Sequence, residues 1–350
     1  MNPAQLIPIV DPIPIPGPWF DVLLIITFVA HILFMNVVVG GAVISLAGHV
    51  SGKGVPLSRS LSKRMPTILA LTINMGVAPL LFLQTVYGQF DYTSSVLMAG
   101  YWLAVVGLLL AAYYGLYIYD FKFDGLGGLR TPLLVLTLGM MLWIGFMFSN
   151  NVTLMLRPEK WFDYFTTNGA GFLNLDDPVL YPRYLHFMVG SLAVGGLFVA
   201  LVAHFKAEPE HLETGMVWFT RATLVNIAVG VWFLMALPKD IMLRFMGGHL
   251  PSTAVLVLGL VGALALVWSG MKRNPVLAAV LTVITVLFMV IARHLVRTAY
   301  LAPWFDSSQL PVTGEYSTLM LFLFFLAVGL PCVFWLVRTY LKPDNAQGDA

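Results

Sequence analysis

Several histidines in the chain have an arginine close by. Arg183 precedes His186 by three residues and Arg297 follows His294 by three, an interval of about one helical turn. A neutral imidazole is a good ligand for iron or zinc, and a guanidinium pairs with carboxylates through parallel hydrogen bonds. The residues that could combine these two properties are His31, His186, His249 and His294 with Arg183, Arg244, Arg293 and Arg297.

A haem would use both residue types, because its iron takes an axial imidazole and its propionates need cations at the water boundary. We therefore predict the four histidines as iron ligands and the four arginines as partners of the propionates. The alternative is that the arginines anchor helix ends at a membrane surface while the histidines form hydrogen bonds between helices. A single His/Arg pair would favour that alternative, whereas three such pairs on one side of a membrane favour haem.

Small residues follow His186 along the same apolar stretch. Gly190 and Ala193 stand four and seven residues after it, and Gly195 and Gly196 come next. Such residues would leave room for a flat porphyrin beside the backbone. They are equally typical of helices that pack closely against each other, so this pattern alone favours neither interpretation.

The composition defines the class of protein that must position these residues. Of 350 residues, 59% are hydrophobic and 10% are charged, against about 25% charged in soluble domains. We therefore predict an all-α integral membrane protein. The net charge of only +2 argues against nucleic-acid binding. The single cysteine, Cys332, excludes an internal disulfide, a cysteine-rich zinc site, an iron–sulfur cluster and a covalent CxxCH haem site on this chain.

Nine stretches are long and apolar enough to span a bilayer, which takes about 20 residues as a helix. Together they form one membrane domain, residues 20–337, preceded by an extended proline-rich lip over 1–19 and followed by a tail over 338–350. The predicted spans are 20–47, 66–88, 96–119, 131–155, 183–205, 216–237, 251–269, 275–298 and 317–337.

The distribution of lysine and arginine predicts the orientation of these spans. With the amino terminus outside and the carboxyl terminus in the cytoplasm, twelve of the 19 basic residues, Arg221 among them, fall on the inner side. His49, His204 and His211 then lie at cytoplasmic helix ends, where a solvated ring needs no further partner. The other four histidines lie in the outer half of the membrane, where ionisable groups are costly and usually functional. Asp21 and Asp120 lie at the ends of predicted spans and no other aspartate or glutamate falls inside one, so we expect no carboxylate path for protons.

The segment "DPVLYPRYLHFMVGSLAVGGLFVALVAHF", residues 177–205, resembles subunit I of the cytochrome bd quinol oxidases. That family has nine helices, an outside amino terminus and three haems near the outer face. It places a basic residue and an axial histidine at the spacing of Arg183 and His186. "HILFMNVVVGG" resembles the family's first helix, in which His31 would be another axial ligand. Weaker matches are "INMGVAP", "LWIGF" and "TRATLVNIAVG".

The chain also departs from the family at functional positions. His294 stands where the family has a glutamate at a high-spin haem, although Arg297 is retained. For the second ligand of the low-spin haem, Met246 matches the family motif and His249 matches the expected depth in the helix; we favour His249 and expect Met246 to pack or face lipid. The two glutamates of the family's third helix are missing, Gln84 replaces one in the second, and the quinol loop shrinks to "PKDIMLRFMGGHL".

The resemblance implies a membrane-embedded electron-transfer subunit with two or three b-type haems in the bacterial cytoplasmic membrane, the haems lying toward the periplasm. It would exchange electrons between the quinone pool and a c-type cytochrome or another periplasmic redox subunit, as part of a quinol–cytochrome oxidoreductase with a second membrane subunit. One alternative is a divergent terminal oxidase that reduces oxygen with quinol. Another is a structural or transport subunit without cofactors.

Overall fold

The computed structural model describes residues 3–52, 54–166 and 171–340, and within them it is an all-α membrane protein. Nine of its helices are long and apolar enough to cross a bilayer, one for each predicted span, which confirms the predicted fold class. They are α1 (Gly17–Ser51), α3 (Met65–Met98), α4 (Gly100–Phe121), α5 (Arg130–Met155), α6 (Leu180–Lys206), α7 (Pro209–Ala236), α9 (Leu250–Met271), α10 (Pro275–Leu301) and α11 (Ser317–Tyr340).

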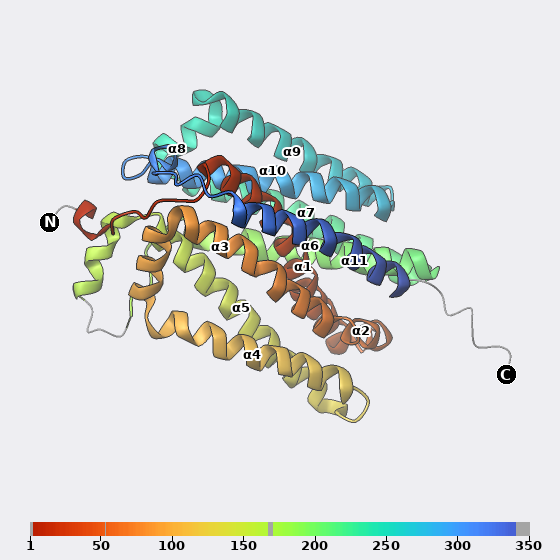
Figure 1. The fold of residues 1–350 in the computed structure, drawn as a ribbon. Coiled ribbons are helices and arrows are strands. Elements are labelled where there is room, and N and C mark those ends of the chain that lie inside the picture. The colour runs from red at the N-terminus through yellow and green to blue at the C-terminus, as the bar shows by residue number, and fades with distance from the viewer. Residues whose placement is uncertain (1–2, 53, 167–170, 341–350) are drawn as a thin grey trace.

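The long helices lie side by side and run roughly along one axis (Figure 1). One end of the bundle carries the short helices η3 (Pro158–Thr166) and α8 (Lys239–Leu243) and the connection 302–316; we call it the α8 end. The helices α6 and α9 begin at the α8 end, whereas α3 and α10 finish there. The remaining short helices are η1 (Pro3–Leu6), α2 (Val55–Ser62), η2 (Gly127–Leu129), the π-helical turn η4 (Arg244–Gly248) and η5 (Ser307–Gln309).

The proline-rich amino-terminal segment contains the 3₁₀ helix η1 and is otherwise without helix until α1 begins at Gly17. Ile13 pairs with the chain after α10: its N–H donates to Pro311 O over 2.8 Å, and its carbonyl accepts from Thr313 N over 2.9 Å. Pro18 suits the first turn of α1, where a backbone N–H has no helical partner. Residues 1–2 of the predicted lip and 341–350 of the predicted tail lie outside the described residues.

Helix α3 is ten residues longer than the predicted span at its carboxyl end. It bends at Tyr87, whose backbone is not helical (φ −119, ψ 21), and then continues through Asp91 to Met98. Asp91 is 2% exposed and accepts a hydrogen bond of 3.1 Å from Nε2 of Gln84. Asp91, which follows the predicted span, thus belongs to the same helix, and Gln84 of that helix partners its carboxylate.

Helix α7 begins at Pro209, not at the predicted residue 216. Arg221 is therefore the thirteenth residue of this 28-residue helix and does not belong to the loop before it. Its side chain is exposed on the surface of the bundle, beside Trp218. No carboxylate lies within ion-pair distance of it among the residues that the structure describes.

Helix α6 packs backbone to backbone between α1 and α7, and this contact explains two of the small residues after His186. A Cβ atom on Gly195 would lie 2.6 Å from the carbonyl carbon of Gly40 on α1. A Cβ atom on Gly196 would lie 2.7 Å from the backbone oxygen of Gly215 on α7. Both glycines thus serve helix packing, and they hold α6 in the middle of the bundle.

Candidate functional site

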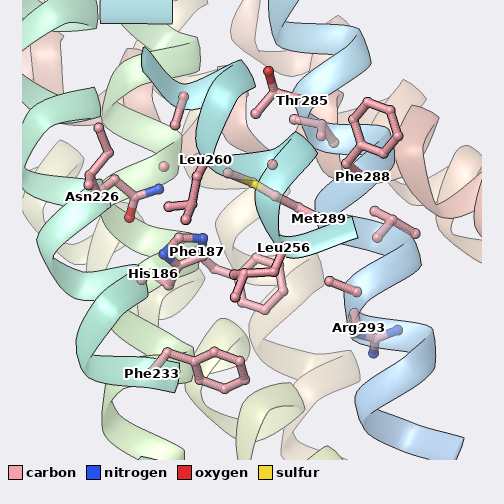
Figure 2. A pocket seen from close by; sticks show the side chains of 18 of the residues that line it. His186, Phe187, Asn226, Phe233, Leu256, Leu260, Thr285, Phe288, Met289 and Arg293 are labelled. Atoms are coloured by element: carbon pink, nitrogen blue, oxygen red, sulfur yellow. The ribbon is translucent and has the colours of Figure 1, made fainter. Parts of the chain in front are cut away.

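A cavity of about 290 Å³ lies between α1, α6, α7, α9 and α10. Voids inside proteins are usually no larger than a water molecule, and ligand pockets start near this size, at about 300 Å³. In Figure 2, Phe233 and Arg293 lie toward one end of the cavity and Thr285 toward the other. Its walls are mainly apolar, with Leu256 and Leu260 contributed by α9. A ligand of substantial size and largely apolar surface would fit this space.

His186 enters the cavity from α6, at a place where α7 has no side chain. A Cβ atom on Gly230 of α7 would lie 3.2 Å from Cε1 and 3.5 Å from Nδ1 of the His186 ring. Because these are the ring atoms nearest to α7, Nε2 is the nitrogen farther from that helix. Nδ1 is buried on the α7 side, where the backbone of Asn226 can hydrogen-bond to the ring. Nε2 is therefore the ring nitrogen that is available to a ligand in the cavity.

Two arginines line the same cavity near the α8 end. Arg183 is 5% exposed, its guanidinium carbon lies 5.2 Å from the ring centre of Phe233, and its Nε and Nη2 atoms are buried without a partner. The guanidinium carbon of Arg293 lies 4.5 Å from the ring centre of Phe28 on α1. Across residues 3–52, 54–166 and 171–340, neither arginine has a carboxylate within 4 Å. They therefore retain the capacity to bind an anionic group.

Small residues of α6 widen the cavity on the side away from the α8 end. Gly190 and Ala193 both line it, as expected if they leave room beside the backbone. The polar residues Asn36 of α1 and Asn226 of α7 line it as well, and each has a buried Oδ1 atom without a partner among the described residues. Figure 2 also shows Met289 extending from α10 into the cavity. Nothing in the sequence singled out Met289 or the two asparagines.

His31 faces α3 and is not among the residues that line the cavity. Its Nδ1 lies 2.9 Å from the carbonyl oxygen of Thr72, so Nδ1 carries the proton and donates it. The ring fills the space left by Gly76, where a Cβ atom would lie 2.8 Å from Cε1. This hydrogen bond leaves Nε2 as an acceptor, the tautomer that metal-binding histidines use.

His294 and Arg297 form a cluster with residues of α1 and α3, outside the cavity. Arg297 is 4% exposed and donates from Nη2 to Nδ1 of His294 over 2.9 Å. Oδ1 of Asp21 lies 3.6 Å from the same imidazole nitrogen and accepts a 3.4 Å hydrogen bond from the hydroxyl of Tyr87. Arg297 also stacks over the Tyr87 ring at 4.4 Å. Unlike Arg183, Arg297 thus already has neighbours for its charge.

The residues at the start of α9 point elsewhere. His249 precedes the first residue of α9, and its Nδ1 lies 2.9 Å from the hydroxyl of Ser252. Met246 is 58% exposed, and Arg244 is exposed in the same π-helical turn. None of the three lines the cavity. Of the nine residues selected from the sequence, the structure brings Arg183, His186 and Arg293 together.

The start of α6 is fixed by a polar cluster in the preceding loop. Oδ1 of Asp177 accepts from the backbone N–H of Val179 over 2.8 Å, and Oδ2 accepts from Nδ2 of Asn174 over 3.2 Å. Oδ2 also lies 3.4 Å from Nη1 of Arg157. In the same loop, a hydrogen bond from Lys160 lowers the pKa of Asp176. These contacts anchor the first turn of α6 and with it the direction in which Arg183 points.

The chain was compared with known proteins at three levels. No protein family, no curated protein and no solved structure matches it.

Proposed function

We propose that the chain is a membrane b-type cytochrome that holds a haem in the cavity between α1, α6, α7, α9 and α10. His186 would be an axial ligand of the iron, and Arg183 and Arg293 would pair with the propionates. The observation that carries the proposal is one apolar cavity lined by the buried imidazole of His186 and by two arginines without carboxylate partners among the described residues. A haem has the matching properties: a large apolar ring, an iron atom that binds imidazole and two carboxylates.

The electrostatics of this cavity fit a ligand with negative charge at one end only. Burying a guanidinium without a counter-ion is costly, and pairing it with a carboxylate offsets part of that cost. Arg183, in the first turn of α6, and Arg293, near the end of α10, both lie toward the α8 end, whereas Thr285 at the opposite end is neutral. Arg183 and Arg293 would thus hold the propionates of a haem at the α8 end of the cavity.

Bound haem supplies one-electron transfer. The protein residues would ligate the iron, orient the ring and keep water away from it, which are the main means of setting a haem potential. The chain would then pass electrons between the quinone pool and a c-type cytochrome or another periplasmic redox subunit, as an oxidoreductase component with a second membrane subunit. With the amino terminus outside, the α8 end faces the periplasm of a bacterial cytoplasmic membrane and brings the cavity near that partner.

His31 and His294 remain candidates for further b-type haems. In support of His31, its Nε2 is left as an acceptor by the hydrogen bond to Thr72. His294 accepts from Arg297 at Nδ1, so binding iron through Nε2 would require that hydrogen bond to rearrange. The sequence-based proposal of Met246 or His249 as a second ligand gains no support from the cavity, and Arg244 lies apart from it.

The test is a reduced-minus-oxidised spectrum of the protein purified in mild detergent, with a pyridine haemochrome assay to count b-type haem. We expect a low-spin b spectrum that is lost in His186→Ala and retained in the matched control His204→Ala, a histidine at the other end of α6. A protein without a Soret band would overturn the proposal and favour a subunit without cofactors. Carbon monoxide binding together with oxygen consumption on quinol would instead identify a divergent terminal oxidase.

A further inference from the structure

Two of the helices that line the cavity, α6 and α10, carry the same arrangement of residue types. On α6, Arg183 stands three residues before His186; on α10, Arg293 stands four residues after Met289. Intervals of three and four place both members of each pair on one helix face, and all four residues line the cavity. Because α6 starts at the α8 end and α10 finishes there, each arginine lies about one turn nearer to that end than its partner.

We propose that Met289 is the second axial ligand of the haem iron, opposite His186, and that each helix contributes one ligand and one arginine. The inference rests on the proposed function. A thioether sulfur is a known axial ligand of haem iron opposite histidine. In Figure 2, Met289 extends from α10 into the same cavity that His186 enters from α6, so both side chains would be available to one haem iron. Arg183 and Arg293 would then meet the propionate edge of the haem.

Neither residue that the sequence offered for this position lies in the cavity. Met246 is 58% exposed in the turn before α9. His249 precedes α9 and is engaged with Ser252 over 2.9 Å. The competing explanation for Met289 is packing, since methionine is unbranched and fills irregular spaces in apolar interiors. That explanation predicts that a leucine of similar volume would serve equally well.

Ligation by Met289 has a consequence that packing does not have. A neutral thioether favours the reduced iron relative to a second imidazole, so a His/Met haem has a higher reduction potential than a bis-histidine haem. In the oxidised state it also produces a sulfur-to-iron charge-transfer band in the far-red or near-infrared. Both properties can be measured on purified protein without an assay of activity.

The experiment compares the wild-type protein with Met289→Leu, Met289→His and the control Met246→Leu. We expect Met289→Leu to lose the charge-transfer band and to gain a carbon monoxide-induced spectral shift at the haem of the cavity. Met289→His should keep a low-spin spectrum, lack the band and titrate at a lower potential. Met246→Leu should be indistinguishable from the wild type in all three measurements.

The outcomes separate this inference from the function on which it rests. A wild-type protein that purifies without haem would overturn the proposed function. A wild-type protein with haem whose low-spin spectrum and potential are unchanged in Met289→Leu, or are altered in Met246→Leu instead, overturns only the role of Met289. If Met289→Leu retains no haem at all, Met289→His decides: recovery of low-spin haem supports ligation, and failure to recover it contradicts ligation.

Discussion

Gly230 decides whether the His186 ring can occupy its place beside α7. A Cβ atom at this position would lie 3.2 Å from Cε1, which is tighter than nearly all ordinary contacts, so even alanine would push the ring. The sequence gives no warning of this, because a glycine in a membrane helix is common and its neighbour lies on another helix. Only the folded structure places Gly230 against a residue that is 44 positions earlier in the chain.

We therefore predict that Gly230→Val displaces the His186 ring and lowers haem retention at least tenfold, because the three added carbon atoms occupy space that the ring fills. The measurement is haem content per protein from the pyridine haemochrome assay, with Gly107→Val as the control. A Cβ atom on Gly107 of α4 would have no atom within 4 Å. Equal haem content in the two variants would contradict the placement of His186 against α7.

Arg221 is the feature of the α7 helix that fits a lipid environment least well. It is the thirteenth of 28 residues and is exposed, so the helix carries a cation near its middle on an outward surface. On insertion scales, arginine at the centre of a membrane helix costs about 2.5–3.5 kcal/mol, whereas leucine contributes roughly −0.3 to −0.6 kcal/mol. The apolar residues of α7 offset this insertion cost, since the helix still has a mean hydropathy of 1.5 over its most apolar window.

Replacement of Arg221 by leucine is accordingly expected to improve insertion of the α7 segment by at most about 3 kcal/mol, the difference that applies at the centre of a span. The measurement is the inserted fraction of residues 209–236 in a translocon assay, in which the segment is tested apart from its neighbours. Thr214→Leu, near the start of the helix, is the matched control and should change insertion far less. A change for Arg221→Leu no larger than that for Thr214→Leu would mean that the arginine reaches the interface by snorkelling.

The helices show how far the sequence determines the elements. All nine spans follow from length and hydropathy alone, because a bilayer requires long apolar helices. The helix ends do not, since α3 continues past Tyr87 to Met98 and includes Asp91, whose carboxylate accepts a hydrogen bond from Gln84. The site divides in the same way: Arg183 and His186 are neighbours on one helix and can be found by spacing. Met289 cannot be found in this way, because a methionine in an apolar helix is usually a packing residue, and only the folded structure shows that it lines the same cavity as His186.

At the scale of the whole molecule, a cavity of about 290 Å³ should weaken the protein when no ligand occupies it. A ligand that binds only the folded state stabilises it by about 2.7 kcal/mol at a free concentration of 100 times its dissociation constant. We predict that haem-depleted protein, produced by haem-limited expression, unfolds at a temperature several degrees below that of the loaded protein in the same detergent. The measurement is the thermal unfolding midpoint by tryptophan fluorescence. His186→Ala should shift little between the two growth conditions, and an equal shift in the variant would contradict loading through His186.

The helices that form the walls of the cavity are synthesised at different times. His186 and Arg183 belong to α6, and with α1 and α7 they are complete once the ribosome has passed residue 236, whereas Met289 and Arg293 follow on α10, after α9. A nascent chain at that stage would carry His186 on a surface that α9 and α10 do not yet cover. The α9–α10 hairpin, which supplies the remaining walls, would then close over that surface. The order of synthesis therefore bears on assembly of the site, because α9 and α10 are made last and complete a cavity whose other walls are α1, α6 and α7.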